Sequence, residues 1–174
     1  MKIRKLKAGD ASKFFDVRLM GLREFSHAFG RSADEFQKQT LDSIADQIET
    51  GVSQGNFILG AFNDEDELLG VVGFLKQPGE KVRHTAILWG MYVIPQARRK
   101  GVARELIKEF IAEVRKHEEI EQIKLTVESG NLSARRLYES FGFEPFGTEP
   151  RVLKVDGKYY HEDHMMLRLK NSGN

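Results

Sequence analysis

Hydrophobic residues recur in two periods along the chain, and the alternation of these periods predicts a mixed α/β protein. Short apolar runs rich in β-branched and aromatic residues predict strands at residues 2–6, 57–62, 68–75, 85–93, 122–127, 143–155 and 158–169. Apolar residues that recur every three or four positions predict helices at about residues 10–25, 41–51, 102–114 and 131–141.

Local capping and turn signals mark the ends of several of these elements. Asp10 or Ser12 is suited to cap the first helix, and Ser32-x-x-Glu35 matches a capping box. Asp156-Gly157 predicts the turn of a final hairpin.

The order of the elements predicts one domain. The series β, α, α, β, β, β, α, β, α, β, β favours a mixed central sheet of about six to seven strands with helices on both faces. No linker, repeat or low-complexity segment divides residues 1–174. A length of 174 residues and 40% hydrophobic content suit a single core.

A basic turn separates the apolar run 85–93 from the helix that follows it. The turn reads Pro-Gln-Ala-Arg-Arg-Lys-Gly-Val-Ala-Arg over residues 95–104. Backbone N–H groups in the first turn of a helix lack internal partners and carry partial positive charge, so cations there are unfavourable unless an anion binds between them. The turn therefore predicts a phosphate site; the alternative is a solvated loop in which Gly101 serves only the turn.

A second segment, residues 131–143, has the pattern of a short capped helix. Asn131 is a good N-cap, and Gly142 is well placed as the left-handed residue after the helix. Helix physics explains this shape completely, but it does not explain a tyrosine at 138, whose hydroxyl needs a partner if it is buried.

Together the two segments resemble the GCN5-related N-acetyltransferase (GNAT) superfamily. Arg98-x-x-Gly101-x-Ala103 is similar to its coenzyme A pyrophosphate loop, and residues 131–143 are similar to its Asn-x-x-Ala-x-x-Leu-Tyr-x-x-x-Gly-Phe motif. The chain departs from the commonest loop at Ala103 and Arg99, where glycine is frequent, yet both residues keep the main-chain amides. The resemblance spans nearly the whole chain and is strongest from about residue 69 to 143.

The resemblance implies that residues 1–174 form a single N-acetyltransferase domain with acetyl-CoA as co-substrate. The residues that it assigns to binding acetyl-CoA are Met91, Tyr92, Val93, Arg98, Arg99, Lys100, Gly101, Val102, Ala103, Arg104, Asn131 and Tyr138. It also gives Gly90 a meaning, because the corresponding strand of the family bulges and parts from its neighbour to open a cleft. The alternative for Gly90 is a glycine that makes room for Trp89 or a neighbouring helix.

Amide formation needs a neutral amine, a donor for the developing oxyanion and a proton for the leaving thiolate. Main-chain N–H groups near Met91 to Val93 are the implied oxyanion partners, and Tyr138 is the candidate general acid. Glu128 is the candidate base, directly or through water; the alternative is a surface carboxylate, and His84 is a weaker candidate. Because the chain has no cysteine and no Gly-x-Ser-x-Gly motif, direct transfer to a primary amine in a ternary complex is favoured over an acyl-enzyme.

The acceptor amine is not readable from the chain. The resemblance places its site near residues 23–39 and the last hairpin, where Tyr160 and Asp163 are candidates to line the entrance. A metal site at His161 and His164 is disfavoured because the two side chains point to opposite faces of a strand.

Charge and hydropathy narrow the class of protein. The net charge is +1, from 27 basic and 26 acidic residues, so a nucleic-acid-binding surface is not expected. No apolar run is long enough to span a bilayer and no secretory signal pattern occurs, so a cytoplasmic protein without membrane attachment is expected. A homodimer is one expectation, since homodimers are common in the superfamily. The alternative function is an acyl-CoA-binding sensor without turnover.

Overall fold

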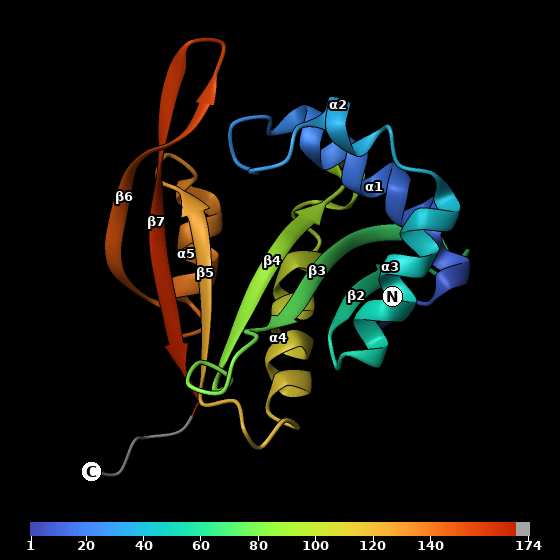
Figure 1. Cartoon of the computed structure of the whole chain (residues 1–174). Helices are drawn as coiled ribbons and strands as arrows, with labels where there is room; N and C mark the ends of the chain where they lie inside the picture. The colour runs from blue at the N-terminus through green and yellow to red at the C-terminus, as the bar shows by residue number, and fades with distance from the viewer. Residues whose placement is uncertain (170–174) are drawn as a thin grey trace.

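The computed structural model describes residues 1–169, which form one seven-stranded sheet flanked by helices (Figure 1). The strands are β1 (Lys2–Lys5), β2 (Phe57–Phe62), β3 (Leu68–Lys76), β4 (Thr85–Val93), β5 (Gln122–Glu128), β6 (Glu144–Val155) and β7 (Lys158–Arg168). Their order is β1-β2-β3-β4-β5-β7-β6. Only the β4–β5 pair of this sheet is parallel, and the other five described pairs are antiparallel.

Helices cover both faces of the sheet, as the pattern of elements predicts. They are α1 (Ala11–Glu24), α2 (Ala33–Phe36), α3 (Leu41–Ser53), α4 (Val102–Val114) and α5 (Leu132–Glu139), with single 3-10 turns η1 (Ala8–Asp10) and η2 (Pro95–Ala97). The apolar residues of α1, α2 and α3 pack with one core cluster, and those of α4 and α5 pack with the other. Adjacent residues of β3 serve different cores, Val71 the first and Val72 the second, because side chains alternate across a strand.

Most of the predicted boundaries are confirmed, and two helix starts differ in detail. The capping box is present, since the Glu35 N–H donates to Ser32 Oγ at 3.1 Å, but it begins only the one-turn α2. Thr40 caps α3, which continues two residues past the predicted stop at Gly51 to Ser53. Asp10 occupies the N-cap position of α1 without a side-chain capping bond, because its carboxylate binds Arg4 and the Lys7 N–H instead.

The sheet opens in its middle, where β4 bulges. Gly90 has a φ of +66°, and between the pairs Val71–Tyr92 and Gly73–Trp89 the β4 strand holds one residue more than β3. The bulge reading of Gly90 is therefore confirmed. The indole of Trp89 is accommodated by Gly73 instead, because a Cβ on Gly73 would lie only 2.1 Å from the Trp89 ring.

β4 and β5 separate shortly before this bulge. They pair only from Thr85 to Ile87 against Gln122 to Lys124, although β4 continues to Val93 and β5 to Glu128. Figure 1 shows the two strands diverging, with α4 and α5 behind them. The parallel pairing thus ends at the level where the cleft begins.

None of the helices formed by residues 1–169 has the length and apolar character that a membrane-spanning segment requires.

Candidate active site

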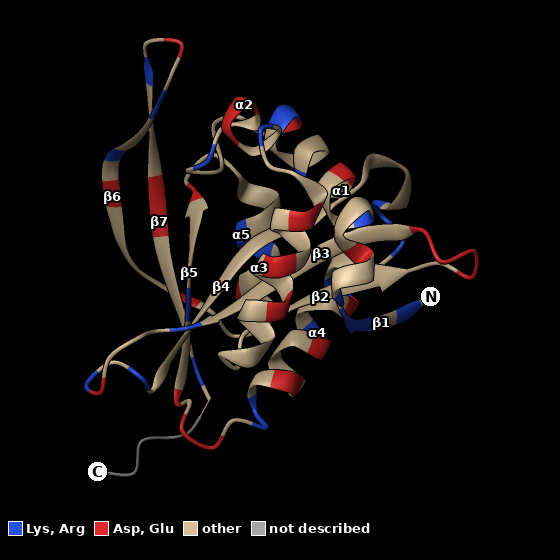
Figure 2. Cartoon of the chain, turned by 45° about the vertical axis from the view of Figure 1, so that its right-hand side comes forward, with Lys and Arg blue, Asp and Glu red and all other residues tan. Residues whose placement is uncertain are grey.

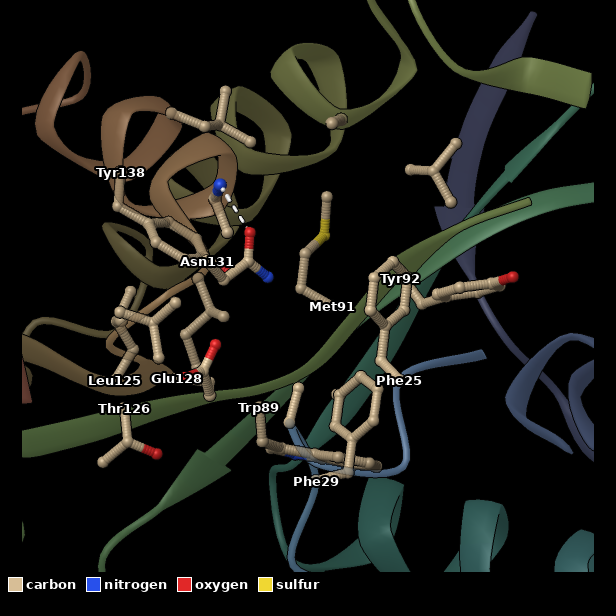
Figure 3. A pocket seen from close by; sticks show the side chains of 18 of the residues that line it. Phe25, Phe29, Trp89, Met91, Tyr92, Leu125, Thr126, Glu128, Asn131 and Tyr138 are labelled. Atoms are coloured by element: carbon tan, nitrogen blue, oxygen red, sulfur yellow. Dashed lines mark hydrogen bonds between the residues drawn. The ribbon is translucent and has the colours of Figure 1, made fainter. Parts of the chain in front are cut away.

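A cavity of about 1010 Å³ occupies the gap between β4 and β5. Its walls come from β4, from the segment after α1, from β5, α5 and β7, and from the turn that precedes α4. Figure 3 shows Tyr138 and Asn131 on one side of it, Phe25 and Phe29 on the other, and Met91 between them. Two sequence motifs that lie about thirty residues apart in the chain therefore meet at one cavity.

The basic turn forms the N-terminus of α4, as predicted. Gly101 is the N-cap residue with a φ of +81°, and Arg99 is also left-handed with a φ of +59°. The first intrahelical bond runs from the Glu105 N–H to the Gly101 carbonyl at 3.0 Å, so the N–H groups of Val102, Ala103 and Arg104 lie before any helical acceptor. Six of the predicted loop residues line the cavity, namely Arg98, Arg99, Gly101, Val102, Ala103 and Arg104. Lys100 is exposed and lies outside that lining.

The guanidinium of Arg98 binds a carboxylate of the same chain. Its Nη1 and Nη2 lie 2.6 and 2.5 Å from the two carboxylate oxygens of Glu24, at the end of α1, and its Nε donates to the Val93 carbonyl at 3.0 Å. The hydroxyl of Tyr92 donates to Glu24 Oε2 at 2.7 Å. The bond from Arg98 holds the pKa of Glu24 below its usual value, and burial followed by the bond to Glu24 raises the pKa of Tyr92. Arg98 and Tyr92 therefore serve to fasten the turn and β4 to α1, a contact that no local motif around Glu24 reveals.

Main-chain groups of β4 face the cavity at alternate residues. The Ile94 N–H donates to Leu69 of β3 at 3.0 Å, and Tyr92 is paired with Val71, so Tyr92 and Ile94 direct their N–H groups toward β3. Because the direction alternates along a strand, the N–H groups of Met91 and Val93 point the other way, toward the gap left by β5. Of the three β4 residues predicted to bind acetyl-CoA, Met91 and Val93 thus have amides on the cavity side, and Tyr92 does not.

Asn131 and Tyr138 hold the positions that the second motif predicts. Asn131 Oδ1 accepts the N–H of Ala134 at 3.1 Å, which caps α5 and leaves Nδ2 directed into the cavity (Figure 3). Tyr138 is 6% exposed, lines the cavity and packs edge-on against Phe143 with ring centroids 5.8 Å apart. Burial raises the pKa of the Tyr138 phenol well above its usual value. Its hydroxyl is therefore protonated at every physiological pH.

Carboxylates gather on the wall formed by β5 and β7. Glu128, the last residue of β5, lines the cavity and accepts the Gly130 N–H on Oε1 at 3.0 Å. Glu162 is its direct partner on β7 and lines the cavity too. Glu149 of β6 lies opposite Glu162 in turn, so the three strands carry an acidic row (Figure 2). His84 precedes β4 at the end remote from the bulge and is not part of the cavity wall.

One prediction for the last hairpin needs correction. Asp163 does not line the entrance: it is 5% exposed and binds Ser129, Thr148 and Arg135, because it points to the face opposite that of its neighbours Glu162 and His164. Tyr160, the other candidate, stacks on His27 of the segment after α1, with ring centroids 4.9 Å apart, and so lies where the hairpin meets residues 23–39.

His161 and His164 have separate partners. His164 Nε2 lies 3.1 Å from Glu149, and His161 Nδ1 accepts the Arg151 N–H at 3.3 Å. Within residues 1–169 no group of three or more histidine, cysteine or acidic side chains is placed to hold a metal ion.

Sequence reasoning missed Arg18. This residue of α1 is 9% exposed and lines the cavity, and its guanidinium lies over the rings of Phe29 and Trp89, 4.5 and 6.0 Å from their centroids. Burial, together with the nearby Arg31, lowers the pKa of Arg18 to about 10. An arginine on the buried side of an amphipathic helix is the one signal in the sequence that points to it, since arginine is rarely buried without a partner.

Comparison with solved structures shows the same fold in bacterial proteins. A ribosomal-protein-alanine N-acetyltransferase from Brucella melitensis is 23% identical, with a TM-score of 0.85 over 97% of this chain and 100% of that one. A GNAT-family acetyltransferase from Streptococcus pneumoniae is 20% identical, with a TM-score of 0.86 over 97% and 99%. The yncA protein of Salmonella typhimurium, solved with its cofactor acetyl-CoA, is 21% identical, with a TM-score of 0.87 over 100% and 96%.

Sequence comparison identifies the family of the chain. None of the curated protein sequences compared matches the chain significantly. The model of the acetyltransferase (GNAT) family matches residues 21–143, which include the turn before α4, the bulged strand and the whole of α5. The chain therefore belongs to the acetyltransferase (GNAT) family and is an acetyl-CoA-dependent N-acetyltransferase.

Proposed function

We propose that the chain acetylates a primary amine by direct transfer within a ternary complex of protein, acetyl-CoA and amine, and that residues 1–174 act as one N-acetyltransferase domain. The observation that carries the proposal is the convergence of three sets of donors on one cavity. These are the first N–H groups of α4, the N–H groups of Met91 and Val93, and the Nδ2 of Asn131.

The donors suit two polar parts of acetyl-CoA, its pyrophosphate and its thioester carbonyl. The N-terminus of α4 has unpaired amides and a positive dipole, which fit the pyrophosphate, and Arg99 and Arg104 add charge at the same place. Lys100 lies just outside and contributes at longer range. Acetyl-CoA supplies the acetyl group in an activated thioester.

The roles of the remaining residues follow from their protonation and position. The Met91 N–H is the donor for the oxygen on which negative charge develops. Tyr138 is neutral because burial disfavours the phenolate, and its position on the cavity wall makes it the proton donor for the departing sulfur. Glu128 receives the proton of the amine, directly or through water, from its place on the cavity wall.

A thiol-release assay with acetyl-CoA and a broad panel of primary amines tests the proposal. We expect turnover with at least one class of amine and steady-state kinetics in which both substrates bind before either product leaves. Binding of acetyl-CoA by calorimetry without thiol release on any amine would overturn the catalytic proposal in favour of a sensor. Initial-rate patterns of a ping-pong reaction would overturn direct transfer.

Glu128→Gln tests the base. We expect the kcat/KM for the amine to fall by about 100-fold, because the amine loses its proton acceptor. Glu144→Gln, an exposed carboxylate at the start of β6, is the control and leaves kcat/KM unchanged. An unchanged kcat/KM in Glu128→Gln would show that Glu128 is not the base.

A further inference from the structure

The most unusual polar group of the molecule is the guanidinium of Arg18. Its Nη1 is the one buried side-chain nitrogen or oxygen within residues 1–169 that has no hydrogen-bond partner. A buried cation without an acceptor is costly, and such groups are seldom kept unless a ligand completes them. The rings of Phe29 and Trp89 offer it cation–π contact but no acceptor.

Arg18 lies next to the reacting part of the cavity. Its Nη1 is 3.4 Å from the place that a Cβ on Gly90 would occupy. Gly90 is the bulge residue directly before Met91, whose N–H faces the gap, and consecutive Cα atoms are about 3.8 Å apart. The unpaired guanidinium therefore lies close to the proposed oxyanion donor, so a small molecule can contact both.

The opposite wall carries the opposite charge. Glu128 and Glu162 face each other across β5 and β7, an arrangement that costs stability because like charges repel. Within the described part of the chain neither of them forms an ion pair, and both line the cavity. The guanidinium on one side of the cavity thus has no anionic partner, and the two carboxylates on the other side have no cationic partner.

We propose that the acceptor is a small zwitterion of the amino-acid type, whose carboxylate binds Nη1 of Arg18 while its amine lies toward Glu128 and Glu162. The inference rests on the proposed function and names the substrate class for the same site. Phe25, Phe29 and Trp89 form an apolar part of the cavity wall, and the last two lie against Arg18, so the uncharged portion of the acceptor lies against these rings (Figure 3). A carboxylate that enters this position replaces lost solvation of the guanidinium with a charge-assisted hydrogen bond.

Matched sets of acceptors test the proposal in the thiol-release assay. Each set contains an amino acid, its amide and the amine that lacks the carboxyl group, for example leucine, leucinamide and 3-methylbutylamine. We expect the amino acid to have the highest kcat/KM of its set, by about 10- to 100-fold, because the other two leave Arg18 unpaired. Glycine, β-alanine and 4-aminobutanoate then measure the distance between amine and carboxylate that the site accepts.

Arg18→Met gives the matched change in the protein. It removes the charge and keeps an apolar side chain of similar length, so we expect the preference for the amino acid to be lost while the Kd for coenzyme A stays within about twofold. Arg23→Met on the same helix is the control, because Arg23 is exposed and binds Gln37 outside the cavity. Arg18→Lys is expected to recover part of the preference.

Stability separates this role from a structural one. Removal of an unpaired buried cation is neutral or stabilising, so Arg18→Met is expected to unfold at the same or a higher temperature than the parent protein. If Arg18→Met lowers the Tm and leaves the acceptor preference unchanged, Arg18 is a structural residue and the proposal is overturned.

A binding measurement keeps the proposal testable without turnover. Calorimetry on protein saturated with coenzyme A compares N-acetylleucine with N-acetylleucinamide, and we expect the acid to bind at least about 10-fold more tightly, with the difference lost in Arg18→Met. If amino acids and their amides are acetylated equally well, and N-acetylleucine and N-acetylleucinamide bind equally well, the proposed substrate class is wrong. The N-acetyltransferase proposal is unaffected by that result. If no amine is acetylated but the protein still binds N-acetylleucine selectively, the catalytic proposal is wrong and the proposed carboxylate site at Arg18 is unaffected.

Discussion

Tyr138 has its ring buried between α5 and the core while it remains part of the cavity wall. The shift of its pKa comes from burial alone, and it acts in one direction: the neutral phenol is favoured up to a higher pH than in water. A raised pKa also makes the phenol a weaker acid, so transfer of its proton to the departing sulfur depends on the position of the hydroxyl and not on tuned acidity.

Tyr138→Phe is the corresponding prediction. We expect kcat to fall by about 100-fold with the best acceptor, because the departing sulfur loses its proton donor. The Kd for coenzyme A is expected to change by less than about twofold, since the ring still fills its place against Phe143. Thiol release and calorimetry on the same preparation measure the two values, and an unchanged kcat would exclude Tyr138 as the acid.

At the scale of elements, the start of α4 depends on a backbone conformation that suits glycine. Gly101 has a φ of +81° and its added Cβ would meet nothing within 4 Å, so a substitution there costs conformational energy without a clash. Gly157, in the turn of the last hairpin, has a φ of +80° and equally open surroundings. The chain therefore contains a matched pair of left-handed glycines, one at the site and one far along the sequence from it.

We expect Gly101→Ala and Gly157→Ala to lose similar stability, about 1 kcal/mol each, because both force alanine into the left-handed region. Only Gly101→Ala is expected to weaken coenzyme A binding, by roughly 5-fold, the value of one hydrogen bond to the shifted loop. Urea unfolding and calorimetry give the two quantities. Equal effects of both substitutions on the Kd would mean that the turn before α4 has no special part in binding.

The contact between Glu24 and Arg98 joins α1 to the same turn. Since Arg98 and the hydroxyl of Tyr92 both bind Glu24, loss of this carboxylate frees the turn and the end of β4 together. We expect Glu24→Gln to raise the KM for acetyl-CoA, and the double variant with Arg98→Met to add little further change, because the two residues act as a unit. A fall in KM in Glu24→Gln would show instead that the released Arg98 binds the phosphate.

The elements were largely readable from the sequence, and the contacts between them were not. The period of hydrophobic residues gave all seven strands and four of the five helices, and the two motifs placed Asn131, Tyr138 and the turn before α4 at one cavity. The one-turn α2 is too short to leave a period. The sequence did not predict the roles of Glu162, Arg18 and Glu24, because these roles depend on strand register and on the packing of α1 over β4. Both bring together residues that lie more than thirty positions apart in the chain. Asp163 was misplaced by one position, and on a strand one position changes the face.

At the scale of the whole molecule, an ion pair at the first strand contributes to the stability of the fold. Both oxygens of Asp10 bind Arg4, at 2.7 and 2.8 Å, and one also accepts the Lys7 N–H at 2.9 Å. The bond from Arg4 is the main reason why the pKa of Asp10 lies below its usual value. A depressed carboxyl pKa stabilises the folded state above the unfolded-state pKa of about 4, and this contribution is lost as the pH falls through the folded-state value.

We expect Asp10→Asn to lower the free energy of unfolding by about 1–3 kcal/mol at pH 7, because a buried charge-assisted bond is lost and Arg4 is left without it. The difference from the parent protein is expected to be smaller at pH 3 than at pH 7, because the stabilisation by the charged carboxyl group declines below the unfolded-state pKa of about 4. Asp16→Asn, at an exposed position of α1, is the control and shows no such dependence. A difference that is the same at both pH values would mean that the charge of Asp10 is not what stabilises the fold.

The separation of β4 from β5 leaves two rows of backbone amides and carbonyls without strand partners inside the molecule, where most proteins would have a continuous sheet. The two parts of the sheet on either side are joined by the short β4–β5 ladder and by the core cluster that β2 to β5, β7, α4 and α5 share. A ligand that fills this seam therefore also braces it, and mass action ties resistance to unfolding to ligand supply. The lifetime of this protein in a cell would then follow the level of its acetyl donor, so that scarcity of the donor removes the enzyme as well as its substrate.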